Sequence, residues 1–249
     1  IRYLVFTGFA VLLIGPGRVR TVFRSARPLL QGGRGLLQLV EAAVFVLAFA
    51  YLPLADVHAI AAASPLIVVA LSAPLLGERV APAQWLAVAA GFSGVLLILR
   101  PGFQTVEWPL LLPVAGAFLW GYYQILVRQC AGFDSSETTL LWSALVGLVA
   151  VSSVAPLQWR TPDLMALALL VAIGLLGSAA HLALIKALAF AQAAAIQPFT
   201  YTLLLWVTIL GYLVFGDLPD VWTVAGALVV LGSGLFSWHR EWRAAQDGV

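Results

Sequence analysis

The chain alternates long apolar stretches with short polar segments over nearly its whole length. Each apolar stretch has roughly the 17 to 25 residues that an α-helix needs to cross the hydrocarbon core of a bilayer. The pattern predicts nine spans, at residues 3–22, 35–52, 56–76, 82–99, 108–128, 138–156, 163–187, 190–214 and 220–238. Because open strand edges find no hydrogen-bonding partner in lipid, the predicted fold class is an all-α integral membrane bundle.

The composition supports a membrane protein and argues against several other classes. Of 249 residues, 62% are hydrophobic and 10% are charged, whereas about a quarter of a soluble domain is charged. A net charge of +2 gives no argument for a nucleic-acid partner. The single cysteine, Cys130, rules out an internal disulfide framework and a cysteine-based metal cluster. The sequence has no nucleotide-binding or metalloprotease motif, so neither a cofactor nor a metal is expected.

The positive charges predict an orientation. If the loop at 15–34 is cytoplasmic, the alternation of spans places ten of the 13 Lys and Arg residues on that side. These are Arg18, Arg20, Arg24, Arg27, Arg34, Arg79, Arg128, Lys186, Arg240 and Arg243. The positive-inside rule then predicts a cytoplasmic C-terminal tail at 242–249. Arginine outnumbers lysine twelve to one and alanine is abundant, a bias typical of GC-rich bacterial genomes, so a bacterial inner (plasma) membrane protein is expected.

Two segments of the chain repeat the same order of features. The stretch "LLGERVAPAQWLAVAAGFSGVLLI" (75–98) has a Gly-acid turn, a tryptophan and an apolar span with glycines, and "VFGDLPDVWTVAGALVVLGSGLF" (214–236) repeats that order. The span count places the two turns on opposite sides of the membrane, which predicts an inverted repeat with halves 1–102 and 108–241. The first half holds four spans and the second five, so a tenth helix is expected before Ile1.

These repeated segments resemble the drug/metabolite transporter superfamily, and in particular its EamA-like ten-helix branch. The resemblance is carried by "YLPLADVHAIAAASPLIVVALSAPLLGERVAPAQWLAVAAGFSGVLLILRPG" (51–102) and "AFAQAAAIQPFTYTLLLWVTILGYLVFGDLPDVWTVAGALVVLGSGLFSWHRE" (189–241). The order FGDLPD, W, G, SGL, RE is similar to a proteobacterial subgroup that includes riboflavin and S-adenosylmethionine importers. The resemblance implies a secondary transporter whose missing first helix would help to line a central cavity.

Two ionisable residues lie within predicted spans, where polar groups are costly and are functional candidates. Glu41 is expected about six residues into its span, roughly 9 Å from the cytoplasmic end. It could bind a cationic group or a coupling proton, or it could reach the interface or bond to a neighbouring helix. His181 follows the small residues 177–180, which let other helices pack close. It is a candidate for solute or proton binding, and the alternative is a histidine hydrogen-bonded between helices.

Two side-chain stripes are predicted to line a cavity. Trp120, Tyr123 and Gln124 share one helix face, and Gln197 and Tyr201 flank a proline in the same way. Aromatic rings with amide groups suit a planar or amphipathic organic solute. Two prolines, Pro65 and Pro198, are expected to kink their helices, although each could instead only shape packing. The alternative for aromatic residues is an interfacial belt, which Trp108, Trp142, Trp159 and Trp238 fit.

The expected function is secondary transport of a small organic metabolite by alternating access, with a cavity between the two halves. The expected partners are the solute, the lipid bilayer and a candidate coupling proton. A membrane-embedded enzyme acting on lipid is one alternative, but the histidines are scattered and most acids lie in turns. A non-transporting membrane subunit is another, but it would be expected to carry a soluble domain or a long tail. The sequence leaves the substrate, the direction and the oligomeric state open.

Overall fold

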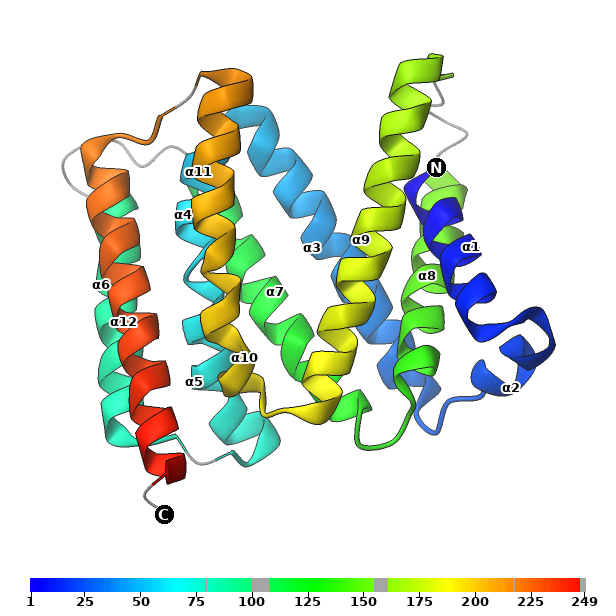
Figure 1. Ribbon diagram of the computed structural model, residues 1–249, viewed down its shortest axis with the longest axis horizontal. Helices are drawn as coiled ribbons and strands as arrows, with labels where there is room; N and C mark the ends of the chain where they lie inside the picture. Colours follow the sequence, from blue (N-terminus) through cyan, green and yellow to red (C-terminus); the bar gives the residue numbers. More distant parts are fainter. Residues whose placement is uncertain (79, 100–107, 155–160, 217, 247–249) are drawn as a thin grey trace. The chain divides into compact units, whose positions relative to one another are not determined.

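The structure is a computed structural model that describes residues 1–78, 80–99, 108–154, 161–216 and 218–246 (Figure 1). All regular elements in these ranges are helices. Eight of them, counting a broken helix as one, are long and apolar enough to cross a membrane, and a bent pair at the N-terminus is a candidate ninth. The predicted all-α membrane bundle is confirmed. Arg79, Trp159 and the aspartate of the second Gly-acid turn, Asp217, lie outside the described ranges.

The helices form two units. Residues 1–39 and 126–191 make the first unit, and residues 40–125 and 192–249 make the second, so α3 and α7 each contribute to both. In chain order the elements are α1 (Arg2–Ile14), η1 (Pro16–Arg18), α2 (Val19–Val22), α3 (Pro28–Tyr51), α4 (Leu54–Ala61), α5 (Ser64–Leu76), α6 (Pro82–Leu99), η2 (Trp108–Leu110), α7 (Leu111–Cys130), α8 (Ser136–Val154), α9 (Leu164–Phe190), α10 (Ala193–Thr200), α11 (Thr202–Phe215) and α12 (Val221–Gln246).

The N-terminal apolar stretch forms a bent pair of helices. Helix α1 ends at Ile14, and the chain bends by 89° before η1 and α2. Gly15 has a φ of 83°, a conformation that favours glycine, and Pro16 has no N–H with which to continue the helix. A 13-residue helix is only about 20 Å long. The bent pair over residues 2–22 is therefore still a candidate for the predicted span over 3–22, although the apolar pattern did not reveal the Gly-Pro break.

Helix α3 is polar on its buried face and apolar on its exposed face. Gln31, Arg34, Gln38 and Glu41 are all buried, whereas Leu29 is 91% exposed. Their spacing of three, four and three residues keeps the four polar side chains on one side of the helix. In water this arrangement would be inverted, but lipid is a favourable solvent for leucine and a poor one for a guanidinium or a carboxylate.

The first unit is held together at glycines. Helix α1 packs against α8 and α9, where Gly147 on α8 faces the Tyr3 ring and Gly174 on α9 faces Val5. A side chain at either glycine would overlap its neighbour, so small residues set the close approach, as is usual between membrane helices. We expected residues 177–180 to provide this approach. Of these residues, Ser178 is buried, whereas nothing lies within 4 Å of a Cβ built on Gly177.

A buried arginine joins α3 to α8 in the same unit. Arg34 was counted among loop arginines, but α3 begins at Pro28, so Arg34 lies inside the helix and is fully buried. Its guanidinium donates to Gln31 Oε1 (2.9 and 3.1 Å), to Ser143 Oγ (2.8 Å) and to the Thr139 carbonyl (2.8 Å). Removing a charged group from water is costly unless such partners replace the water. The placement of Arg34 in a loop was wrong, because apolar character alone set the predicted start of this span.

The turn before α8 anchors the start of α3 to the same network. The Asp134 carboxylate accepts hydrogen bonds from Gln31 Nε2 (2.9 Å), Ser25 Oγ (2.5 Å) and the Ala26 N–H (2.8 Å). Burial alone would raise the pKa of Asp134, but the hydrogen bonds and the positive charge of Arg34 outweigh it and lower the pKa below its ordinary 3.8. The folded unit therefore stabilises the ionised form of Asp134.

This lowered pKa predicts a loss of stability in acid. Because the pKa is lower in the folded chain than in the unfolded one, the stabilisation is present above pH 3.8 and is lost as the pH falls through the folded value. We expect the thermal midpoint of the purified protein to decrease when the pH is lowered below about 4. We expect this decrease to be smaller in Asp134→Asn. A parallel decline of both proteins between pH 6 and pH 3 would contradict this assignment.

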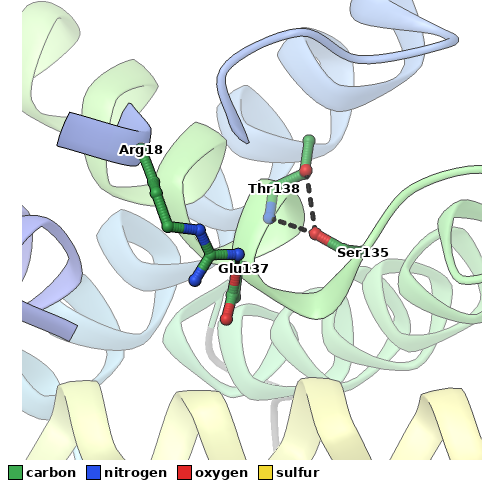
Figure 2. Close-up of polar contacts among 4 residues, drawn as sticks. All are labelled: Arg18, Ser135, Glu137 and Thr138. Carbon is green, nitrogen blue, oxygen red and sulfur yellow. Dashed lines mark hydrogen bonds and ion pairs between the residues drawn. The ribbon is translucent and has the colours of Figure 1, made fainter. Parts of the chain in front are cut away.

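The start of α8 is capped from its own sequence (Figure 2). Ser135 Oγ accepts a hydrogen bond from the Thr138 N–H at 3.1 Å and lies 3.0 Å from the Thr138 hydroxyl. Glu137 lies in the first turn, where the helix dipole favours a negative charge. It also pairs with Arg18 at 3.3 Å, but that pair is largely exposed, and exposed ion pairs add little stability.

The second unit pairs two broken spans. The first is α4 followed by α5, and the second is α10 followed by α11. Helix α4 contacts α11 while α5 contacts α10, so each half of one span meets the opposite half of the other (Figure 1). This pairing is consistent with inverted halves.

Helices α6 and α12 pack along each other beside these broken spans (Figure 1). At their crossing, a Cβ on Gly94 would lie 2.7 Å from the Gly226 carbonyl oxygen, and a Cβ on Gly226 would lie 2.5 Å from the Gly94 carbonyl oxygen. The two backbones therefore touch with no room for a side chain on either helix.

The two Gly-acid turns end their helices in the same way. Gly77 has φ 69° and ψ 17° after α5, and Gly216 has φ 74° and ψ 8° after α11. Both are left-handed cap conformations, which glycine adopts without strain. The carboxylate of Glu78 then accepts a hydrogen bond of 3.4 Å from the Ala193 N–H at the start of α10. The Glu78 carboxylate, which follows α5, thus caps the N-terminus of α10.

Candidate functional site

The second unit contains a cavity of about 260 Å³. It lies at the level where both broken spans are interrupted, since residues on either side of each break line it. Its walls come from α3, α4, α5, α7, α10 and α11. The lining residues are Glu41, Phe45, Phe49, His58, Ala61, Ala62, Ser64, Pro65, Trp120, Thr200, Tyr201, Leu203 and Leu204.

Proline chemistry shapes one wall of this cavity. Pro65 lies in the first turn of α5 and has no N–H to donate to the Ala61 carbonyl, one helical turn earlier. Between α4 and α5 the backbone instead forms hydrogen bonds over a shorter sequence separation, such as the bond of 3.1 Å from the Ala63 N–H to the Ile60 carbonyl. Backbone of this kind is tolerated at membrane depth where it lines a cavity or is covered by protein.

Helix α3 contributes an acid and two rings from a single face. Glu41, Phe45 and Phe49 follow one another at four-residue intervals, and Phe49 stacks on the His58 ring of α4 with centroids 5.3 Å apart. Phe45 is held by Gly116 on α7, where a Cβ would lie 2.9 Å from the ring. The Glu41 side chain and both phenyl rings therefore line the same cavity.

Helix α7 completes the aromatic wall. The Trp120 ring stacks on Tyr123 with centroids 5.5 Å apart and an interplanar angle of 14°. Gly121 lets α7 approach α5, since a Cβ there would lie 2.9 Å from Ile67 and 3.3 Å from the Ser64 carbonyl. Tyr123 is fully buried behind Trp120, so it supports the lining ring from behind.

Tyr201 stands at the second break. Its ring and hydroxyl rest against Gly234 of α12, where any side chain would overlap them. The hydroxyl is buried, and no described residue forms a hydrogen bond with it. The polar end of Tyr201 therefore lies against α12.

The predicted site residues fall into three groups. Glu41, Pro65, Trp120 and Tyr201 line the cavity. Tyr123, Gln124 and Gln197 lie in the same unit and are buried, with Gln197 Nε2 donating to Gln124 Oε1 at 3.2 Å, and Pro198 lies in α10. His181 belongs to the first unit, where its ring meets Phe6 edge-on with centroids 5.6 Å apart.

Sequence reasoning missed Phe45, Phe49, His58 and Thr200. The i, i+4, i+8 spacing of Glu41, Phe45 and Phe49 was the signal that could have identified two of them. Glu41 also lies farther along its helix than expected, because α3 begins at Pro28 and places Glu41 about 20 Å along the helix axis. The structure places His58 in the cavity wall, with its Nδ1 3.0 Å from the Leu54 carbonyl.

A second cavity of about 290 Å³ lies between α4, α11 and α12. It shares Tyr201 and Leu204 with the first cavity, and its other lining residues are mostly aliphatic. None of its lining residues carries a formal charge. The two cavities therefore differ in chemistry, since only the first includes a carboxylate and an imidazole.

Residues 2–100 and 107–238 match the sequence profile of the EamA-like transporter family. A "Riboflavin transporter" of Rhizobium johnstonii is 33% identical over 95% of this chain and 80% of the relative. An "S-adenosylmethionine uptake transporter" of Rickettsia bellii is 27% identical over 92% of this chain and 79% of the relative. A "Pseudopaline exporter" of Pseudomonas aeruginosa is 27% identical over 82% and 71%. A solved crystal structure aligns with 97% of this chain and 87% of its own at a TM-score of 0.67 and 21% identity, which shows the fold.

Proposed function

Because the chain belongs to the EamA-like transporter family, we propose that it carries a small organic solute across the membrane by alternating access, with the solute bound in the cavity of about 260 Å³. The relatives are named as transporters, and this chain is a multi-pass membrane transporter of small metabolites. The solute class, the binding residues and the transport cycle are the proposed part.

The proposal depends mainly on one observation, which is that helices from both predicted halves line the cavity. The cavity walls come from α3, α4 and α5 of the predicted half at 1–102 and from α7, α10 and α11 of the predicted half at 108–241. Solute sites at the interface of two inverted repeats, built from interrupted helices, suit a cycle in which one repeat moves against the other. The aromatic rings and few polar groups of the lining fit a planar or amphipathic solute.

Several finer expectations stay predictions. These are the division into halves 1–102 and 108–241, the cytoplasmic C-terminus, the candidate coupling proton and a role for His181 in transport. The direction is open as well, because the relatives include uptake transporters and an exporter.

Replacing a cavity ring should impair transport without unfolding the chain. We expect Trp120→Ala to lower solute flux in proteoliposomes about tenfold or more, since stacking and packing on an aromatic ring contribute about 1 to 2 kcal/mol. The measurement is uptake and efflux of a metabolite panel that includes riboflavin and S-adenosylmethionine. The matched control is Trp206→Ala on α11, because Trp206 is 59% exposed and should face lipid. Equal flux in wild type and Trp120→Ala would show that the solute does not pass through this cavity.

A further inference from the structure

We propose that the cavity selects solutes in which a positively charged group, such as a sulfonium or quaternary ammonium, is attached to a planar ring or packs beside one. The cation would lie near the Glu41 carboxylate and over the surrounding aromatic faces. This inference rests on the proposed function, because it specifies the substrate class of the same cavity.

The charge of the cavity wall is the first argument. Among its lining residues Glu41 is the only acid, and no lysine or arginine lines the cavity. Interactions between charges are stronger in a site of low dielectric constant than in water. A cation therefore gains attraction from Glu41, whereas an anionic solute is repelled and a neutral one gains nothing from the charge.

The aromatic rings are the second argument. Phe45 and Phe49 lie with ring centroids 6.2 Å apart, and Phe49 stacks on His58. Trp120 and Tyr201 face the same cavity from α7 and from the second break. The face of an aromatic ring attracts a cation, and cages of such rings bind quaternary ammonium groups in proteins. Aromatic rings can also stack on the planar ring of a solute. The same rings could therefore bind both the cationic group and the planar ring.

The two arguments together separate the solute classes suggested by the relatives. A neutral planar solute such as riboflavin would use the rings but would gain no attraction from the charge of Glu41. S-adenosylmethionine has both a planar base and a sulfonium cation. The charge distribution therefore favours the second class, although the riboflavin transporter has the higher identity among these relatives.

Matched ligand pairs that differ mainly in charge test this inference. The first pair is S-adenosylmethionine and S-adenosylhomocysteine, which lacks the sulfonium methyl group and its charge. The second pair is benzyltrimethylammonium and its neutral isostere neopentylbenzene. Binding to the purified full chain is followed by tryptophan fluorescence, which needs no transport. We expect the cation of at least one pair to bind about tenfold more tightly than its neutral match.

Glu41→Gln provides the matched variant, because glutamine keeps the shape and removes the charge. We expect it to reduce the preference within that pair to about twofold or less, and Glu41→Asp to preserve part of it. Equal affinity within both pairs in the wild type would overturn the inference. An equal loss of binding for cation and neutral match in Glu41→Gln would also overturn it, and would point to a structural or proton-binding carboxylate. Failure of the proposed function is distinct, since it would appear as an absence of flux for any solute.

Discussion

Replacement of Arg34 by alanine is expected to lower the free energy of unfolding by about 3 kcal/mol. The guanidinium is fully buried and donates to Gln31, Ser143 and the Thr139 carbonyl. Alanine removes these donors and leaves buried acceptors on α3 and α8 without their partner. Hydrogen bonds to a charged group contribute more than neutral ones, and buried groups that lose a partner carry the full cost of desolvation.

The measurement is the thermal midpoint of the purified protein in detergent at constant pH. The control is Arg24→Ala, since Arg24 is exposed and should change the midpoint little. Arg34→Lys should fall between the two, because an ammonium group cannot reproduce the planar fork of donors. A midpoint for Arg34→Ala equal to that of Arg24→Ala would show that the network does not stabilise the first unit.

A single methyl group at the crossing of α6 and α12 should be nearly as damaging. In Gly226→Ala the new Cβ would lie 2.5 Å from the Gly94 carbonyl oxygen and 2.5 Å from Ile98 Cγ1. The backbone oxygen cannot rotate away as a side chain could, so the two helices must separate. We expect a loss of about 2 kcal/mol, within the range for overpacked cores.

Helix α12 offers an internal control for this substitution. Gly232 has nothing within 4 Å of the position of an added Cβ, so Gly232→Ala should be neutral or slightly stabilising because alanine favours helix. The thermal midpoints of the two variants should therefore move apart. Similar midpoints for Gly226→Ala and Gly232→Ala would contradict the close crossing.

Hydropathy predicted the spans well because lipid imposes a simple requirement on length and polarity. It did not reveal the bend at Gly15 and Pro16, because apolar character carries no information on backbone geometry. It also placed Arg34 in a loop, since no rule based on single residues shows that Thr139 and Ser143 lie opposite it.

The candidate site was predictable only in part, for the same reason. Trp120, Tyr201 and Glu41 stood out as polar or aromatic groups in apolar spans, and all three line the cavity. Phe45 and Phe49 did not stand out, because phenylalanine in a membrane span usually faces lipid. Which ring faces inward depends on the glycine across from it, such as Gly116 opposite Phe45, and that pairing comes from tertiary structure.

The inward polar face of α3 has a consequence for the order in which the protein is made. Arg34 bonds to residues 105 and 109 positions later in the chain. At roughly 5 to 20 residues per second, translation takes roughly 5 to 20 s to reach them. We expect α3 to be retained near the insertion machinery or at the membrane surface during that interval, since a lone arginine opposes release into lipid. Arrival of α8 then allows both helices to enter the bilayer together.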